Sequence, residues 1–152
     1  EDAEVRIAHP GTFNGNPVSA TAGITALGLI ANEPINERAD ANAARLRAGL
    51  RDALTKMEVT GHVHGVASIV QVAIGVEGEC SGEVCSIPHD KIAEATASPR
   101  PEMIRLAMYN EGIDMMGGIG FMVSAVHEER QIDKTAEAFE RALAALRDDG
   151  GI

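Results

Sequence analysis

The segment HPGTFNGNPVSA, residues 9–20, holds the residue types that bind a phosphate or a similar anion. Gly11 and Gly15 let backbone N–H groups approach a ligand closely, and Thr12 adds a hydroxyl donor. Asn16 stands before a proline, which predicts the first turn of a helix with its unpaired N–H groups and positive dipole end. We therefore expect an anion site here, while a capped turn without a ligand explains the same residues equally well from physics alone. The glycine patterns of P-loops and of Rossmann folds are both missing.

His62 and His64 alternate along a predicted strand, so both imidazoles would lie on one face as a metal-binding pair. A third ligand would have to come from His9, His89, His127 or a cysteine, and no spacing in the sequence brings one of them close. We therefore favour ordinary polar residues at a strand edge, and we expect no bound metal.

Cys80 and Cys85 have four residues between them, which matches neither a C-x-x-C redox motif nor a zinc knuckle. A disulfide between them stays open as an alternative, although two cysteines favour a protein of the reducing cytoplasm. Met115 and Met116 could line a pocket, but methionine more often fills gaps in a core. His127 could meet a substrate in the last turn before the final helix, but surface exposure is the simpler expectation.

The composition favours a globular domain and argues against a nucleic-acid or membrane partner. The 152 residues are 45% hydrophobic and 24% charged, with a formal net charge of −10. Anionic surfaces are recognised by clustered lysine and arginine, whereas the basic residues of this chain are scattered. No apolar run approaches the roughly 20 residues that cross a bilayer.

Local patterns predict an α/β fold in which helices pack on a small, mainly antiparallel sheet. Capping residues and apolar spacing predict helices in five segments: 17–30, 35–57, 89–96, 101–112 and 129–147. Alternation predicts three strands: 59–75, 113–116 and 120–124. In the first of these, Val70, Val72 and Ile74 are expected on one face.

Two separated segments resemble one known family. HPGTFNGNPVSATAGITAL resembles the G-T-[FLY]-x-[GN]-N-P segment of class III (fold-type I) pyridoxal-phosphate aminotransferases, closest to the glutamate-1-semialdehyde aminomutases and β-amino-acid aminotransferases. Residues 110–146 are similar to the C-terminal end of that family, where a strand, a His-containing turn and a final helix close the small domain. The match covers nearly the whole chain, and two motifs in the right order are more specific than either alone.

The resemblance implies the C-terminal domain of a fold-type I transferase with pyridoxal 5′-phosphate as cofactor. It places Gly11, Thr12 and Phe13 on the cofactor phosphate in the active site of the partner subunit, so a homodimer is expected. It also divides the chain into a phosphate-binding interface loop, connecting helices and a small α/β domain, at residues 1–16, 17–57 and 58–152.

The catalytic half of such a site is not expected in this chain. The family's Schiff-base lysine lies upstream of the motif, and none of Lys56, Lys91 and Lys134 matches it; each is expected as a solvated charge. We therefore assign no catalytic residue. Ile119 stands where the aminomutases carry an acidic residue and some relatives an arginine, which leaves the substrate undecided. A dimerisation module without turnover and an unrelated phosphate-binding domain remain the alternatives.

Overall fold

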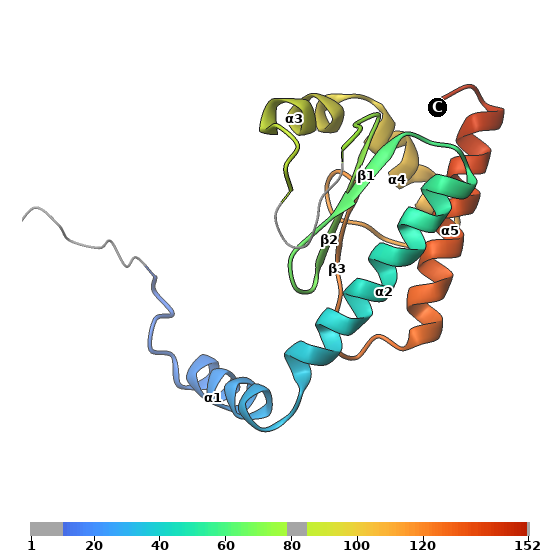
Figure 1. Cartoon of the computed structure of the whole chain (residues 1–152). Helices are drawn as coiled ribbons and strands as arrows, with labels where there is room; N and C mark the ends of the chain where they lie inside the picture. The colour runs from blue at the N-terminus through green and yellow to red at the C-terminus, as the bar shows by residue number, and fades with distance from the viewer. Residues whose placement is uncertain (1–10, 79–84, 152) are drawn as a thin grey trace, which may run out of the picture. The chain divides into compact units, whose positions relative to one another are not determined.

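The computed structural model describes residues 11–78 and 85–151, which form five helices and three strands (Figure 1). In chain order they are α1 (Pro17–Asn32), α2 (Ile35–Lys56), β1 (Gly61–His64), β2 (Ile69–Ile74), α3 (His89–Ala97), α4 (Arg100–Asn110), β3 (Gly120–Met122) and α5 (Glu129–Asp148). The chain forms two compact units, Glu1–Ile35 and Asn36–Ile152.

A three-stranded antiparallel sheet in the order β1-β2-β3 is the centre of the second unit. The register places Val63 of β1 opposite Val72 of β2, and both side chains are buried on one face. Val70 of β2 is fully buried on that face, as the alternation predicts. The predicted α/β class, with helices on a small antiparallel sheet, is therefore confirmed.

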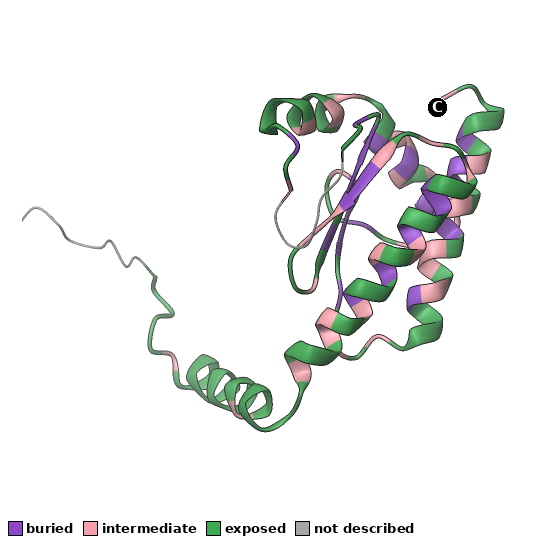
Figure 2. Ribbon diagram, in the orientation of Figure 1, coloured by how far each residue is buried: buried purple, intermediate pink, exposed green. Residues whose placement is uncertain are grey.

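The covered face of the sheet packs against α2 and α5, which lie side by side (Figure 1). Gly49 of α2 lies so close to α5 that an added Cβ would stand 2.7 Å from the Cβ of Ala136, so the small residue allows the close approach. On the exposed side of the two helices, the forked guanidinium of Arg45 donates from Nε and Nη2 to the carboxylate of Asp133 at 2.7 and 2.8 Å. Buried residues line the inner sides of both helices in Figure 2. Apolar packing therefore joins these helices to the sheet, and ion pairs fix their alignment.

Two arginines of α2 cover the free edge of the hairpin β1–β2. Arg51 donates from Nη2 to the carbonyl of Val63 at 3.1 Å, and Arg47 donates from Nη1 to the carbonyl of Ala67 at 3.0 Å. An edge strand otherwise presents unpaired carbonyls to solvent or to another chain. Arginines on the side of α2 away from the core therefore help to protect this edge.

The prediction of a single strand over residues 59–75 is wrong, because the segment folds back as a hairpin. Gly65 takes a φ of +152°, and a Cβ there would overlap the carbonyl of Ile69. Ala67 also has a positive φ, of 51°. Glycine thus allows the close backbone approach at which the chain reverses.

The predicted strand at residues 113–116 is also wrong. Only Met116 forms a bridge, to Gly120, with an N–O distance of 2.9 Å. The turn between them includes Gly118 with a φ of +72°, and no second pair extends the bridge. The alternating burial of Ile113 and Met115 resembles that of a strand, but a hydrophobic alternation does not itself supply a partner.

Phe139→Ala should lower the free energy of unfolding of this unit by about 3–5 kcal/mol, the usual loss for a buried phenylalanine. The side chain is 0% exposed in the main core, so its removal leaves a cavity. Urea unfolding followed by circular dichroism measures the change. Glu137→Ala, at an exposed position of the same helix, should change it by less than about 0.5 kcal/mol. Equal effects of the two substitutions would contradict the position of Phe139 in the core.

Candidate functional site

The predicted anion-binding segment forms a hydrogen-bonded turn in front of α1. The N–H of Asn14 donates to the carbonyl of Gly11 at 3.1 Å, and the N–H of Asn16 donates to the carbonyl of Phe13 at 3.0 Å. A Cβ at Gly11 would overlap the side chain of Asn14, so glycine suits the closed turn. Gly15 has a φ of +79°, which glycine adopts without strain. The two glycines therefore shape the turn rather than only leaving space for a ligand.

Asn16 caps α1, as predicted. Its Oδ1 accepts the N–H groups of Val18 and Ser19 at 2.9 and 3.4 Å, and Pro17 occupies the first helical position. These two N–H groups are therefore already paired. An anion at this place would be bound mainly by the turn, with the helix dipole as a weaker contribution.

Thr12 and Phe13 are exposed at the tip of the turn, with Phe13 at 77%. Within residues 11–78 and 85–151, no hydrogen bond involves the hydroxyl or the N–H of Thr12. A hydroxyl and adjacent backbone N–H groups are the donors that a phosphate accepts from. The donors of Gly11, Thr12 and Phe13 thus fit a phosphate group, such as that of the pyridoxal phosphate that the resemblance implies. His9 lies outside the described residues.

The helix that follows the turn carries no charged residue and buries none of its side chains. The sequence of α1 is PVSATAGITALGLIAN, and Val18, Ile24 and Leu27 are 78%, 72% and 67% exposed. Figure 2 shows α1 without a buried position. An apolar helix of a folded protein is normally covered by other protein. Among the described residues, no helix is long and apolar enough to cross a membrane.

The three lysines considered at the sequence level lie on helices. Lys56 forms an ion pair with Glu140, with an Nζ–Oε1 distance of 2.5 Å, and its side chain is 68% exposed. Lys91 and Lys134 are exposed on α3 and α5. These positions agree with the expectation of solvated charges.

Ile119 is buried in the main core at 4% exposure, and its carbonyl accepts the N–H of Val72 at 2.9 Å. The position where the family carries an acidic residue or an arginine is therefore part of the packing in this chain. A hollow of about 490 Å³ nearby is lined by both Met115 and Met116 and by His127. The sequence had favoured a core position for the methionines, but only Met115 is buried, whereas Met116 is 44% exposed.

His127 is partly buried rather than freely exposed. Its Nδ1 accepts the N–H of Ser124 at 3.1 Å, and its carbonyl accepts from the amide of Asn42 at 2.9 Å. The imidazole therefore stabilises the turn before α5 and ties that turn to α2. Such a role explains the residue without a substrate contact.

The H-x-H pair of β1 faces away from the main core, with the two rings stacked at a centroid distance of 5.4 Å. Burial, followed by the nearby Arg51, lowers the pKa of His62; burial and the neighbouring His62 lower the pKa of His64. Among residues 11–78 and 85–151, no group of three histidine, cysteine or acidic side chains is arranged to hold a metal ion. Cys80 lies outside these residues.

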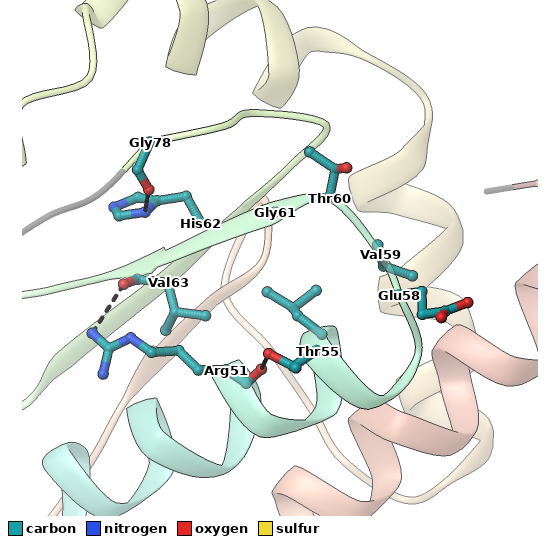
Figure 3. Close-up of a pocket in the computed structure, with 10 residues that line it drawn as sticks. Arg51, Thr55, Glu58, Val59, Thr60, Gly61, His62, Val63 and Gly78 are labelled. Atoms are coloured by element: carbon teal, nitrogen blue, oxygen red, sulfur yellow. Dashed lines mark hydrogen bonds between the residues drawn. The ribbon is translucent and has the colours of Figure 1, made fainter.

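A hollow of about 730 Å³ follows the edge of β1 and was missed by sequence reasoning (Figure 3). Arg51 and Thr55 line it from α2, Glu58 from the linker, and His62 from β1. These residues are separated in sequence by the end of a helix and a linker, so no spacing pattern identifies them.

The comparisons with known proteins agree with the resemblance of the two motifs. The chain is 33% identical over 144 residues to a glutamate-1-semialdehyde 2,1-aminomutase of Methanopyrus kandleri, an alignment that covers 94% of the chain and 32% of the relative. No family model matches the chain.

Solved structures share its fold. An omega-transaminase from Sphaerobacter thermophilus matches with a TM-score of 0.72 and 24% identity, over 93% of this chain and 31% of that one. A transaminase with PLP bound matches with a TM-score of 0.73 and 23% identity, over 96% of this chain and 31% of that one. The chain thus spans about a third of the length of these proteins.

The stability of the second unit should fall as the pH drops below about 6.5, the ordinary histidine pKa. The pKa values of His62 and His64 are lower in the folded chain than in the unfolded chain, so the unfolded chain binds protons first as the pH falls. The two neutral histidines therefore contribute to stability above pH 6.5, and this contribution is lost as the pH falls toward their folded pKa values. His64→Gln should flatten the decline below about pH 6.5 by up to about 1 kcal/mol per pH unit. Urea unfolding at several pH values measures it. His89→Gln, at an exposed position, is the matched control; equal slopes in both variants would contradict the prediction.

Proposed function

We propose that this chain, which corresponds to the C-terminal portion of a class III pyridoxal-phosphate aminotransferase, completes the cofactor site of a partner subunit in a homodimer. The turn at Gly11, Thr12 and Phe13 would bind the phosphate, and α1 would lie in the interface. The reaction of the intact enzyme would be transfer of an amino group on an amino acid or an amino-ketone.

The absence of charge and of burial in α1 is the observation that supports this proposal most. A helix with this sequence would expose Val18, Ile24 and Leu27 to water unless another protein surface covered them. Phe13, also exposed, stands just before it. A second subunit that covers α1 would bring the turn in front of it to the interface, where a phosphate can lie between the subunits.

The donor set of the turn supports a phosphate as its ligand. The Thr12 hydroxyl would donate one hydrogen bond and backbone N–H groups of the turn would donate others, while the capped start of α1 adds a favourable dipole. Pyridoxal phosphate supplies the electron sink for amino-group chemistry when it is bound. This chain would bind the phosphate by hydrogen bonds and so fix the position of the cofactor. The Schiff-base lysine and its proton transfers would belong to the rest of the enzyme.

The relatives favour one reaction as the first to test. The aminomutases move nitrogen within one molecule and the transaminases move it between two, and the sequence relatives favour the aminomutase as the first activity to test. The buried Ile119 supports a substrate that needs no charged partner at that position.

A dimerisation module without turnover is the second candidate. The reducing cytoplasm remains our proposal for the compartment.

Thr12→Ala should weaken retention of pyridoxal phosphate by the intact dimeric enzyme by about 1–3 kcal/mol, because the variant loses a hydrogen bond to a charged group. That corresponds to a dissociation constant roughly 5- to 150-fold higher. The visible absorbance of the bound cofactor during dialysis measures it. Thr12→Ser keeps the hydroxyl and should retain the cofactor nearly as well. Unchanged retention in Thr12→Ala would remove this residue from the site.

Ile24→Asp should convert the intact dimer into monomers at micromolar concentration, because a charge would be buried in the proposed interface. Sedimentation velocity measures the change, and cofactor retention should fall with it. Ala41→Asp, at an exposed position of α2, should leave the dimer intact. A dimer that tolerates Ile24→Asp would place the interface elsewhere.

A further inference from the structure

His62 is a buried imidazole whose two ring nitrogens have separate partners. The residue is 6% exposed, and Nδ1 lies 3.2 Å from the carbonyl oxygen of Gly78. A carbonyl only accepts, so Nδ1 carries the proton in this contact. Figure 3 shows the ring pointing toward Gly78 on the side of β1 away from α2. In the neutral ring, Nε2 is left with a free lone pair.

That lone pair faces a thiol. The Sγ of Cys85 lies 3.5 Å from Nε2 of His62, so the thiol can donate its proton to the ring. Cys85 is partly exposed and packs against a small cluster formed by Ala73, Val76 and Ile87. The thiol is therefore held in place on one side and open on the other.

The fold brings these groups together from three segments. β1 supplies the imidazole, the end of the segment after β2 supplies the Gly78 carbonyl, and the approach to α3 supplies the thiol. A nucleophile beside a base, with the base oriented by a third group, is the arrangement that activates cysteine in enzymes. Burial lowers the pKa of His62, so the ring is neutral and its Nε2 accepts the thiol proton as the sulfur attacks, which is the role of a general base.

We infer that Cys85 is a nucleophilic thiol activated by His62, and that it exchanges with low-molecular-weight disulfides. In the first step the thiol proton moves to Nε2 of His62 while the sulfur attacks one sulfur of the disulfide. The S–S bond of the reagent breaks as the new one forms. The leaving thiolate then takes the proton from His62, so a mixed disulfide on Cys85 and one free small thiol result, with no further oxidant.

A metal ion bound between His62 and Cys85 is the weaker alternative. His62 and Cys85 supply two ligands, and within the described parts of the chain no third histidine, cysteine or carboxylate joins them. Structural zinc needs four protein ligands and catalytic zinc three. Reaction at the sulfur needs only the two side chains that are in contact.

The experiment uses the 152-residue chain with Cys80→Ser, which leaves Cys85 as the single thiol. The neutral reagent 4,4′-dithiodipyridine releases a chromophore on exchange, and its second-order rate is measured at neutral pH. His62→Gln in this background should slow the reaction at least about tenfold, because the variant loses the base that takes the thiol proton as the sulfur attacks. His89→Gln removes an exposed imidazole near the same segment and should change the rate less than about twofold.

Circular dichroism shows whether the His62→Gln chain is folded. If it is folded and reacts as fast as its parent, the inference is overturned. If it is unfolded, the parent chain decides the question: Cys85 should react faster in the folded chain than in the same chain in concentrated urea at the same pH. A folded rate equal to or below the unfolded rate overturns the inference as well. Mass spectrometry of the product must place the adduct on Cys85.

Discussion

The packing of one face of a small sheet against α2 and α5 is the constraint on which the second unit depends. Val70 of the sheet, Leu50 of α2 and Phe139 of α5 are all at 0% exposure, so they form a contiguous core. The arginines of α2 then reach the free edge of the hairpin, and the Arg45 fork aligns α2 with α5. Burial therefore holds the unit together, and the exposed charges orient it without contributing much stability.

Because α2 and α5 cover one face of the sheet, the side chains on the opposite face are available for different chemistry. The outward positions of β1 are histidines, and the ring of His62 contacts the Gly78 carbonyl and Cys85 rather than the main core. A second, smaller apolar cluster of Ala73, Val76 and Ile87 packs against Cys85 and against Ile92 of α3. Alternation along a single strand thus divides structural residues from residues available for reaction.

The first unit depends on a different balance. Its helix has apolar and small residues but no charges, so its stability in water depends on a surface that covers it. The turn before it is shaped by two glycines, and Asn16 caps the helix that follows.

The sequence by itself determined what depends on neighbours along the chain. The ends of α1 and α5, the alternation of β2, the capped turn at Asn16 and the two family motifs were all predictable, because caps, periodicities and motifs are local properties.

Only the tertiary structure decided how distant segments meet. The reversal at Gly65 turned one expected strand into two, residues 113–116 formed only the single bridge at Met116, and Ile119 became a core residue. The meeting of His62 with Cys85 is of the same kind. Strand register and loop return set such contacts, and the energy that selects them comes from burial summed over the whole unit, which no short stretch of sequence contains.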